Sequence, residues 1–174
     1  MKRLTHTEYD NTIRDLFGVE LNVTERFPTE LIGNSGFENS SNTLFLQSSL
    51  MERYIGAAQT VVDLALPDEP RTAEHFKTRE LIFKVTPDEN ISHSEASRIV
   101  LSEFLSRAYR RPATEEELQS AAKQYDEARE QGLLFEASIK QVIQSALISP
   151  KFLLRVEAGD ADTESYRVSD WELA

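Results

Sequence analysis

The feature that most constrains the fold of this chain is a repeated signal for the start of an α-helix. A Ser or Thr is followed three residues later by Glu at Thr5-x-x-Glu8, Ser92-x-x-Glu95 and Thr114-x-x-Glu117. In such a capping box the hydroxyl accepts a backbone N–H of the first turn, and the Glu carboxylate accepts the N–H of the cap residue. Each box therefore predicts that a helix begins directly after it.

Apolar residues recur after these boxes with the spacing of one helical face. We expect five main helices, at residues 5–17, 43–66, 92–109 and 114–132 and from residue 135 up to Pro150. Gly18 provides a left-handed end for the first helix, and Pro150 is expected to end the fifth. The predicted class is all-α, with small bundle-like helical units joined by long loops.

Each expected helix has one apolar stripe that we predict to be buried. The stripes are Tyr9, Ile13, Leu16 and Phe17; Leu50, Tyr54, Ala57, Ala58, Val61 and Ala65; Val100, Leu101, Phe104, Leu105 and Ala108; Leu118, Ala121, Ala122, Tyr125 and Ala128; and Phe135, Ile139, Val142, Ile143, Ala146 and Leu147. The segment from Glu80 to Thr86 alternates weakly like a strand. A single strand would have no partner, so we expect an extended loop there.

Turn residues and caps also suggest how the chain is divided. Residues 67–75, which contain Pro67 and Pro70, are interpreted as a linker between an N-terminal helical part (1–66) and a second helical part (76–158). Another Ser-x-x-Glu box lies in the last segment, 159–174. Since a cap makes sense only before a helix, we expect the natural protein to continue into a further domain. The alternative is a coincidence of a short motif at a frayed end.

Charge and cysteine content exclude several kinds of function. A formal net charge of −11 repels nucleic acid and anionic lipid surfaces, so no nucleic-acid partner is expected. The apolar runs are far shorter than the roughly 18 residues of a membrane span, so no membrane insertion is expected. Met1-Lys2-Arg3-Leu4 resembles the charged start of a signal peptide, but polar and charged residues from His6 to Asp10 stand where its apolar segment would lie, so none is expected within this chain. Zero cysteines exclude disulfides, thiolate metal sites and covalent CxxCH haem attachment, so we expect no cofactor here.

One pair of carboxylates is a candidate for acid–base catalysis. Glu8 and Asp15 share a flank of the first expected helix. Seven residues separate them by about 10.5 Å along a helix axis, which is too far for a retaining glycosidase. The alternative interpretation is a solvated face that includes an ion pair between Asp10 and Arg14.

Metal-binding patterns are weak in this sequence. The histidines, His6, His75 and His93, have none of the spacings that place two imidazoles on one helical face, so solvated histidines are expected rather than ligands. An acidic loop that contains Asp160 and Asp162 suggests a calcium site, but it lacks the Gly and Glu positions of an EF-hand. We interpret it as an exposed loop, with weak cation binding as the alternative.

A loop rich in Gly, Asn and Ser is one candidate for a ligand or partner surface. It spans residues 33–42 and would present Asn34, Asn39 and Asn42. Loops of this composition carry binding residues disproportionately, and they also serve as ordered connections. The residues themselves do not name a protein or polysaccharide partner.

The second candidate surface is the basic end of the helix expected at 92–109. It carries Arg107, Arg110 and Arg111. These side chains could clamp an anion or an acidic partner. The alternative is that they bond the last carbonyls of their own helix, where the helix dipole favours positive charge.

Both halves of the chain carry dense motifs. The first half has Leu4-Thr5-x-x-Glu8-Tyr9-x-Asn11-Thr12-x-Arg14-Asp15-Leu16-x-Gly18, then Phe27-Pro28, Gly36-Phe37-x-Asn39, Leu50 and Tyr54. The second half has Phe104-Leu-x-Arg107-Ala108-Tyr109-Arg110-Arg111-Pro112 and Leu147-x-Ser149-Pro150-x-Phe152-Leu153-x-Arg155-x-Glu157. These motifs resemble two consecutive domains of unknown function from large planctomycete proteins that also contain cytochrome-c-like modules. Residues 166–174 resemble the entry to a third helical domain.

The resemblance implies an exported, multidomain, redox-linked protein whose CxxCH motifs lie downstream, so haem is expected elsewhere in the full-length protein. Many relatives hold a cysteine pair near the places of Val85 and Ala96, which this chain lacks. No catalytic residue is transferred. We expect a non-catalytic structural or interaction module whose partners are other domains of the same polypeptide. The alternative is part of a polysaccharide-acting hydrolytic or oxidative enzyme, completed by missing domains, in which residues 33–42 and the Glu8/Asp15 flank line a cleft.

Overall fold

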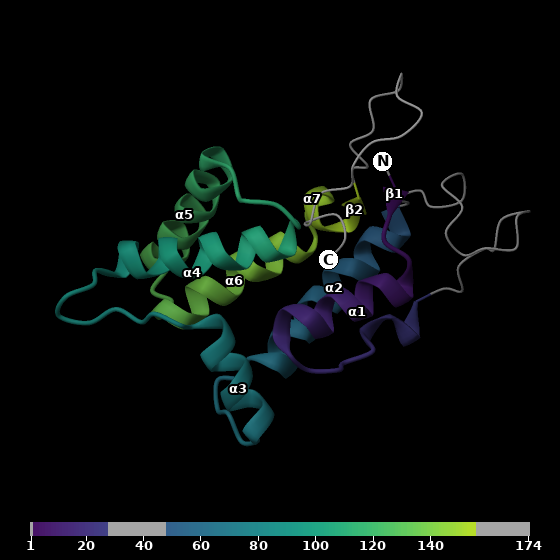
Figure 1. The fold of residues 1–174 in the computed structure, drawn as a ribbon, viewed down its shortest axis with the longest axis horizontal. Helices are drawn as coiled ribbons and strands as arrows, with labels where there is room; N and C mark the ends of the chain where they lie inside the picture. Colours follow the sequence, from purple (N-terminus) through teal and green to yellow (C-terminus); the bar gives the residue numbers. More distant parts are fainter. Residues whose placement is uncertain (1, 28–47, 156–174) are drawn as a thin grey trace, which may run out of the picture.

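The computed structural model describes residues 2–27 and 48–155 (Figure 1). Its described helices are α1 (His6–Phe17), α2 (Ser48–Ala65), α3 (Ala73–Ile82), α4 (His93–Ala108), α5 (Glu115–Glu130), α6 (Phe135–Leu147) and α7 (Pro150–Leu153). A 3-10 helix, Val23–Arg26, follows α1, and two short strands, β1 (Lys2–Arg3) and β2 (Leu154–Arg155), form one antiparallel pair. The all-α class predicted from the sequence is confirmed. None of the described helices is long and apolar enough to cross a membrane.

α1, α4 and α5 begin at the predicted caps. Thr5 Oγ1 accepts the Glu8 N–H at 3.2 Å, and Glu8 Oε2 accepts the Thr5 N–H at 2.8 Å. Thr114 and Glu117 form the same reciprocal box at the start of α5, and the Ser92 hydroxyl caps α4. Gly18 ends α1 in the left-handed conformation, with φ of 72°. Local hydrogen bonds therefore set these helix ends as the sequence predicts.

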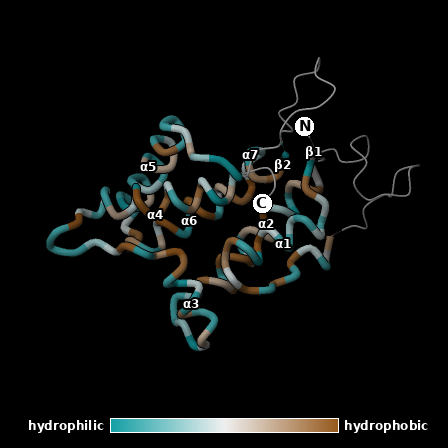
Figure 2. The backbone as a smooth tube through the Cα atoms, in the orientation of Figure 1, coloured by the Kyte–Doolittle hydropathy of each residue, from teal (hydrophilic) through white to brown (hydrophobic). Residues whose placement is uncertain are grey.

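The predicted apolar stripes form the core. All of their members are buried except Leu50, Leu118 and Ala122, which are half-buried. Hydrophobic positions are interspersed with hydrophilic ones along the helices (Figure 2), as one-sided burial requires. In Figure 1, α4, α5 and α6 form one group, α1 and α2 lie beside it, and α3 lies below. α6 links the two groups because it packs against α2 as well as α4 and α5.

The two ends of the described chain are joined. In the antiparallel pair, Lys2 lies opposite Arg155 and Arg3 lies opposite Leu154. The Leu4 N–H extends this ladder by donating to the Leu153 carbonyl at 2.8 Å. Neither strand was predicted, because two residues show no alternation.

Pro150 starts a helix rather than ending one. α6 stops at Leu147, and Pro150 is the first residue of α7, with Ser149 as its N-cap. The fixed φ of proline and its missing N–H suit the first position of a helix. The prediction that Pro150 ends the fifth helix is corrected accordingly.

α3 was not predicted. It begins at Ala73 and includes Glu80 to Ile82, which were expected to be extended; the loop begins only at Phe83. Only Thr78 and Ile82 of this helix are buried, so it has no apolar stripe to detect. It is held instead by its Thr72 cap and by a hydrogen bond from Thr78 Oγ1 to the Phe17 carbonyl at 2.8 Å.

The expected ion pair between Asp10 and Arg14 does not form. Asp10 accepts hydrogen bonds from the N–H and the hydroxyl of Thr24 in the 3-10 helix, and Arg14 pairs with Asp15 at 3.2 Å. Asp10 binds Thr24 instead of Arg14 because the chain turns back after α1 and brings the 3-10 helix against it. Several predictions lie outside the described residues: Asn34, Asn39, Asn42, Asp160, Asp162 and the segment 159–174.

Candidate interaction site at the end of α4

The side chains of the three arginines at the end of α4 bind different elements of the fold. Arg107 Nη2 donates to the carbonyls of Asp15 at 2.7 Å and Leu16 at 3.1 Å. These are carbonyls of the last turn of α1, which have no partner within their own helix. Arg107 therefore caps the negative end of a neighbouring helix and ties α4 to α1.

Arg110 lies where α4 ends. Its φ of 58° is left-handed, and the Arg111 N–H bonds the Ser106 carbonyl at 3.2 Å, which is the six-to-one bond of a Schellman motif. The Arg110 guanidinium donates to the Phe152 carbonyl at 3.2 and 3.3 Å and lies 5.6 Å from the centre of that ring. Arg110 therefore joins the end of α4 to α7.

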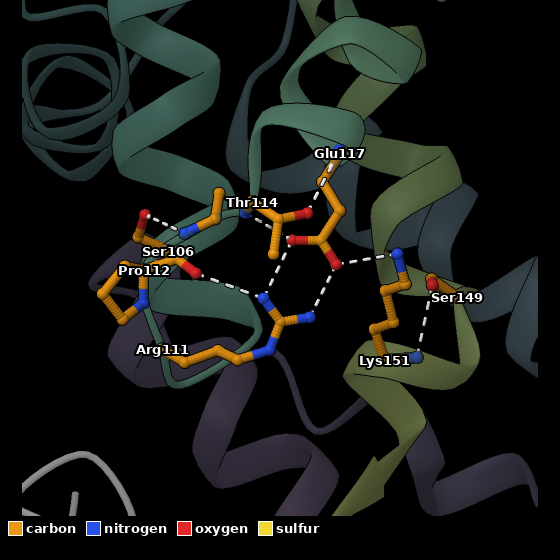
Figure 3. Close-up of polar contacts among 8 residues, drawn as sticks. Ser106, Arg111, Pro112, Thr114, Glu117, Ser149 and Lys151 are labelled. Atoms are coloured by element: carbon orange, nitrogen blue, oxygen red, sulfur yellow. Dashed lines mark hydrogen bonds and ion pairs between the residues drawn. The ribbon is translucent and has the colours of Figure 1, made fainter.

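Arg111 binds α5. Its guanidinium makes a two-point contact with Glu117, from Nη1 to Oε2 at 2.9 Å and from Nη2 to Oε1 at 2.6 Å (Figure 3). It also donates to the Pro112 carbonyl at 3.1 Å and lies 5.9 Å from the Tyr109 ring centre. The three arginines thus bond α1, α7 and α5. The arginines do bond backbone carbonyls, but these belong to α1, α7 and Pro112 rather than to the last turn of α4.

Glu117 is the centre of this cluster. Besides Arg111, its carboxylate accepts the Thr114 N–H at 2.9 Å and the Lys151 ammonium at 2.7 Å (Figure 3). Its side chain is only 4% exposed, so four donors surround a nearly buried anion. The hydrogen bonds from Arg111, aided by those from Lys151 and Thr114, lower the pKa of Glu117 to about 2, although burial opposes the shift. The group is therefore ionised at any physiological pH.

Hydroxyl groups complete the surroundings of Glu117. Ser106 accepts the Ala113 N–H at 3.0 Å and donates to the Ser102 carbonyl at 2.7 Å, which holds the turn between α4 and α5. The Tyr109 side chain hydrogen-bonds Ser149, and burial raises the pKa of the Tyr109 hydroxyl. These contacts connect the end of α4 to the start of α5 and to Ser149, which precedes α7 and Lys151.

A small pocket opens beside Glu117. Its volume is about 160 Å³, and it lies between α4, α5 and α6 at the start of α7. The lining residues are Leu105, Tyr109, Glu117, Ser120, Ala121, Gln124, Val142, Ser145, Ala146, Ser149 and Lys151. Sequence reasoning missed this pocket, since it treated Glu117 only as a cap residue and did not consider Ser149 and Lys151 as site residues. The capping box distinguishes Glu117 from Glu115 and Glu116 in the sequence, but it does not indicate that Arg111 and Lys151 would meet this carboxylate.

The candidate catalytic carboxylates, Glu8 and Asp15, both have partners in the structure. Glu8 accepts the Thr5 N–H at 2.8 Å and pairs with Arg155 of β2 at 3.3 Å. Asp15 pairs with Arg14 at the exposed surface of α1. Glu8 thus fastens the strand pair to α1, and Asp15 faces solvent.

The histidines do not converge on a common centre. His6 packs edge-on against Phe27, His93 packs against Phe135, and His75 accepts the Arg71 N–H at 3.2 Å. Among residues 2–27 and 48–155, no group of three or more His, Asp or Glu side chains is placed to hold a metal ion.

Two family models match the chain. Residues 2–67 match PSD3, described as a protein of unknown function (DUF1587), and residues 96–157 match PSD5, a protein of unknown function (DUF1595). The chain therefore contains two consecutive domains of unknown function, as its motifs led us to expect. No curated protein and no solved structure matches it.

Proposed function

We propose that this chain is a non-catalytic structural and interaction module of a larger protein, and that its partners are other domains of the same polypeptide. The observation that carries the proposal is the use of the charged groups at the end of α4. Arg107, Arg110 and Arg111 each bind a different element, and Glu117 has donors on both oxygens. Charged groups that are hydrogen-bonded to neighbouring elements hold the helices in position. Acid–base catalysis instead needs a group within hydrogen-bond reach of a substrate proton.

The proposal divides the module as the sequence suggests, into helical parts at 1–66 and 76–158 with a linker at 67–75. The positions of the two family matches support this division, because they leave residues 68–95 unmatched between them. Residues 159–174 would begin the next domain.

The finer part of the proposal concerns the full-length protein. We infer an exported protein that is linked to redox chemistry through cytochrome-c-like modules elsewhere in the polypeptide. The support is the resemblance of the motifs to domains of such planctomycete proteins. This chain would carry no covalently attached haem, since it lacks the cysteines of a CxxCH attachment.

A pull-down with the remainder of the full-length polypeptide tests this function. The purified chain is expected to be retained by that remainder and to bind no added haem. An unrelated helical protein of the same net charge serves as the control for ionic attraction. If the folded chain is retained no better than this control, the proposal is contradicted.

Asp15 separates this function from the polysaccharide-enzyme alternative. Its only described side-chain partner is the exposed Arg14, so Asp15→Asn should leave the melting temperature unchanged. A loss of activity of the full-length protein on polysaccharide, with that stability intact, would favour the enzyme. Glu8→Ala is a poor test by itself, because Glu8 also caps α1 and binds Arg155.

A further inference from the structure

The pocket beside Glu117 has both apolar and polar walls. Its apolar lining comes from core residues of α4, α5 and α6, and its polar lining includes Ser120, Gln124 and Lys151. A volume of about 160 Å³ has room for several water molecules or for a small organic group. The question is therefore which chemical group its walls would recognise.

The acceptors on the Glu117 side of the pocket are already occupied. Glu117 Oε1 accepts from Arg111 and Lys151, and Oε2 accepts from Arg111 and the Thr114 N–H. The Ser149 hydroxyl accepts the Lys151 N–H at 3.2 Å. A ligand that needs acceptors would find only neutral oxygens, such as those of Ser120 and Gln124.

Hydrogen-bond donors remain available among the residues that line the pocket. The Lys151 ammonium carries three N–H groups, and one of them meets Glu117. Ser120 and Gln124 make no side-chain hydrogen bond to another residue within the described ranges, 2–27 and 48–155. Since the Lys151 side chain is 52% exposed, a ligand can reach its ammonium from solvent.

The charge at the pocket is opposite in sign to the charge of the chain. Arg111 and Lys151 contribute two positive charges and Glu117 one negative charge, which leaves one net positive charge beside the pocket. The chain as a whole carries −11. A singly charged anion with hydrogen-bond acceptors would satisfy both this charge and the free donors.

We propose that this pocket binds one carboxylate group, held by the Lys151 ammonium with Ser120 and Gln124 as further donors. The carboxylate comes from a free small acid or from an acidic side chain of a peptide. This inference does not depend on the proposed function, because either source can occupy the pocket whatever the role of the full-length protein.

An NMR titration of the full chain at constant ionic strength tests the proposal. Acetate should cause saturable shifts of the Ser120, Gln124 and Lys151 amide signals. Acetamide, its neutral isostere, should bind about tenfold more weakly or worse, since the charged hydrogen bond to Lys151 is lost. Equal binding of acetate and acetamide, or shifts that grow linearly across the whole surface, would overturn the proposal.

Two further ligands identify the source and the class of the group. N-acetylglutamate amide represents a peptide side chain, and tighter binding than acetate would assign the pocket to a peptide. Weaker binding than acetate would assign it to a free small acid. Inorganic phosphate is expected to bind more weakly than acetate, because Glu117 repels a second negative charge. Tighter binding of phosphate would overturn the carboxylate assignment.

Variants of Lys151 provide the control within the chain. Lys151→Met should weaken acetate binding about tenfold or more, and Lys151→Arg should largely retain it. Lys123→Met is the matched control, because Lys123 is an exposed lysine of α5 outside the pocket. If Lys151→Met lowers the melting temperature, the pair Ser120→Ala and Gln124→Leu replaces it and should also weaken binding. Binding at the wild-type level in folded variants contradicts the proposal.

Discussion

The region around α1 and α2 and the group of α4, α5 and α6 are held together by different means. Around α1 the core is aromatic: the Tyr9 ring lies 5.1 Å from Tyr54 and 5.6 Å from Phe152, and Phe27 lies 5.1 Å from Tyr54. The other group buries mainly aliphatic side chains of α4 and α6, and a cluster of charged residues lies at one end of it, around Glu117.

The two regions also differ in how far apart their partners lie in the sequence. α4, α5 and α6 follow one another in the chain and pack against one another. The core of α1 requires Phe152 from α7, and β1 requires β2 at the other end of the described chain. Contacts between neighbouring elements form at a lower entropic cost than contacts that close a long loop. The region around α1 should therefore depend on the α4–α6 group more than the reverse.

Phe152→Ala should have the largest effect. Phe152 is fully buried between Tyr9 and Arg110, so its removal leaves a cavity and should cost about 3 to 5 kcal/mol of unfolding free energy. Urea denaturation measures the change. Hydrogen exchange should show a greater loss of protection in α1 than in α5. Phe76→Ala, at a side chain that is 54% exposed, is the control and should change stability by about 0.5 kcal/mol or less. Equal loss of protection in both helices would refute the proposed dependence.

The pH dependence of stability should report on Glu117. Its pKa is about 2 in the folded chain and 4.5 ordinarily, so its contribution is complete above pH 4.5 and is lost as the pH falls toward 2. The part of the unfolding free energy that disappears should be roughly 2 to 3 kcal/mol. Urea denaturation at several pH values measures it.

Two variants make that measurement specific. In Glu117→Gln this component of the pH slope should vanish, and the chain should already be less stable at pH 7 because Arg111 and Lys151 lose their anion. Glu116→Gln, at the neighbouring exposed residue, should keep the wild-type slope. A wild-type slope in Glu117→Gln would show that the cluster contributes little to stability.

Arg107→Gln tests the link between the two regions. Removal of the guanidinium leaves the Asp15 and Leu16 carbonyls at the end of α1 without this donor, at a cost of about 1 kcal/mol. Thermal unfolding measures the loss. The control is Arg98→Gln on the same helix, whose exposed pair with Glu115 should contribute about 0.5 kcal/mol or less. If both variants lose the same stability, Arg107 does not tie α4 to α1 as proposed.

The smallest expected effect concerns the backbone of Arg110. Both Arg110→Ala and Arg110→Gly remove the contact with Phe152, but only glycine accepts a φ of 58° without strain. Arg110→Gly should therefore be more stable than Arg110→Ala by about 0.5 to 1 kcal/mol. Denaturation of the two variants side by side measures the difference. The opposite order would mean that the left-handed conformation at this residue is not a source of strain.

Local features of the sequence were sufficient to predict the five long helices and their buried faces. A cap such as Thr5 with Glu8 joins groups three residues apart, and an apolar stripe repeats within one helix. α3 escaped prediction because it is short and mostly exposed, and it has no stripe. The same limitation applies to β1 and β2, whose pairing joins residues from opposite ends of the described chain.

The candidate site was predictable only in part. The sequence located the basic end of α4, but it could not tell which element each arginine would reach. Glu115, Glu116 and Glu117 are consecutive and chemically identical, yet only Glu117 turns inward to meet Arg111 and Lys151. Hydrogen bonds within a turn are encoded by neighbouring residues, so a single sequence reveals them. A charge cluster or a pocket depends on which distant helices pack together, and that is set by the burial of the whole core.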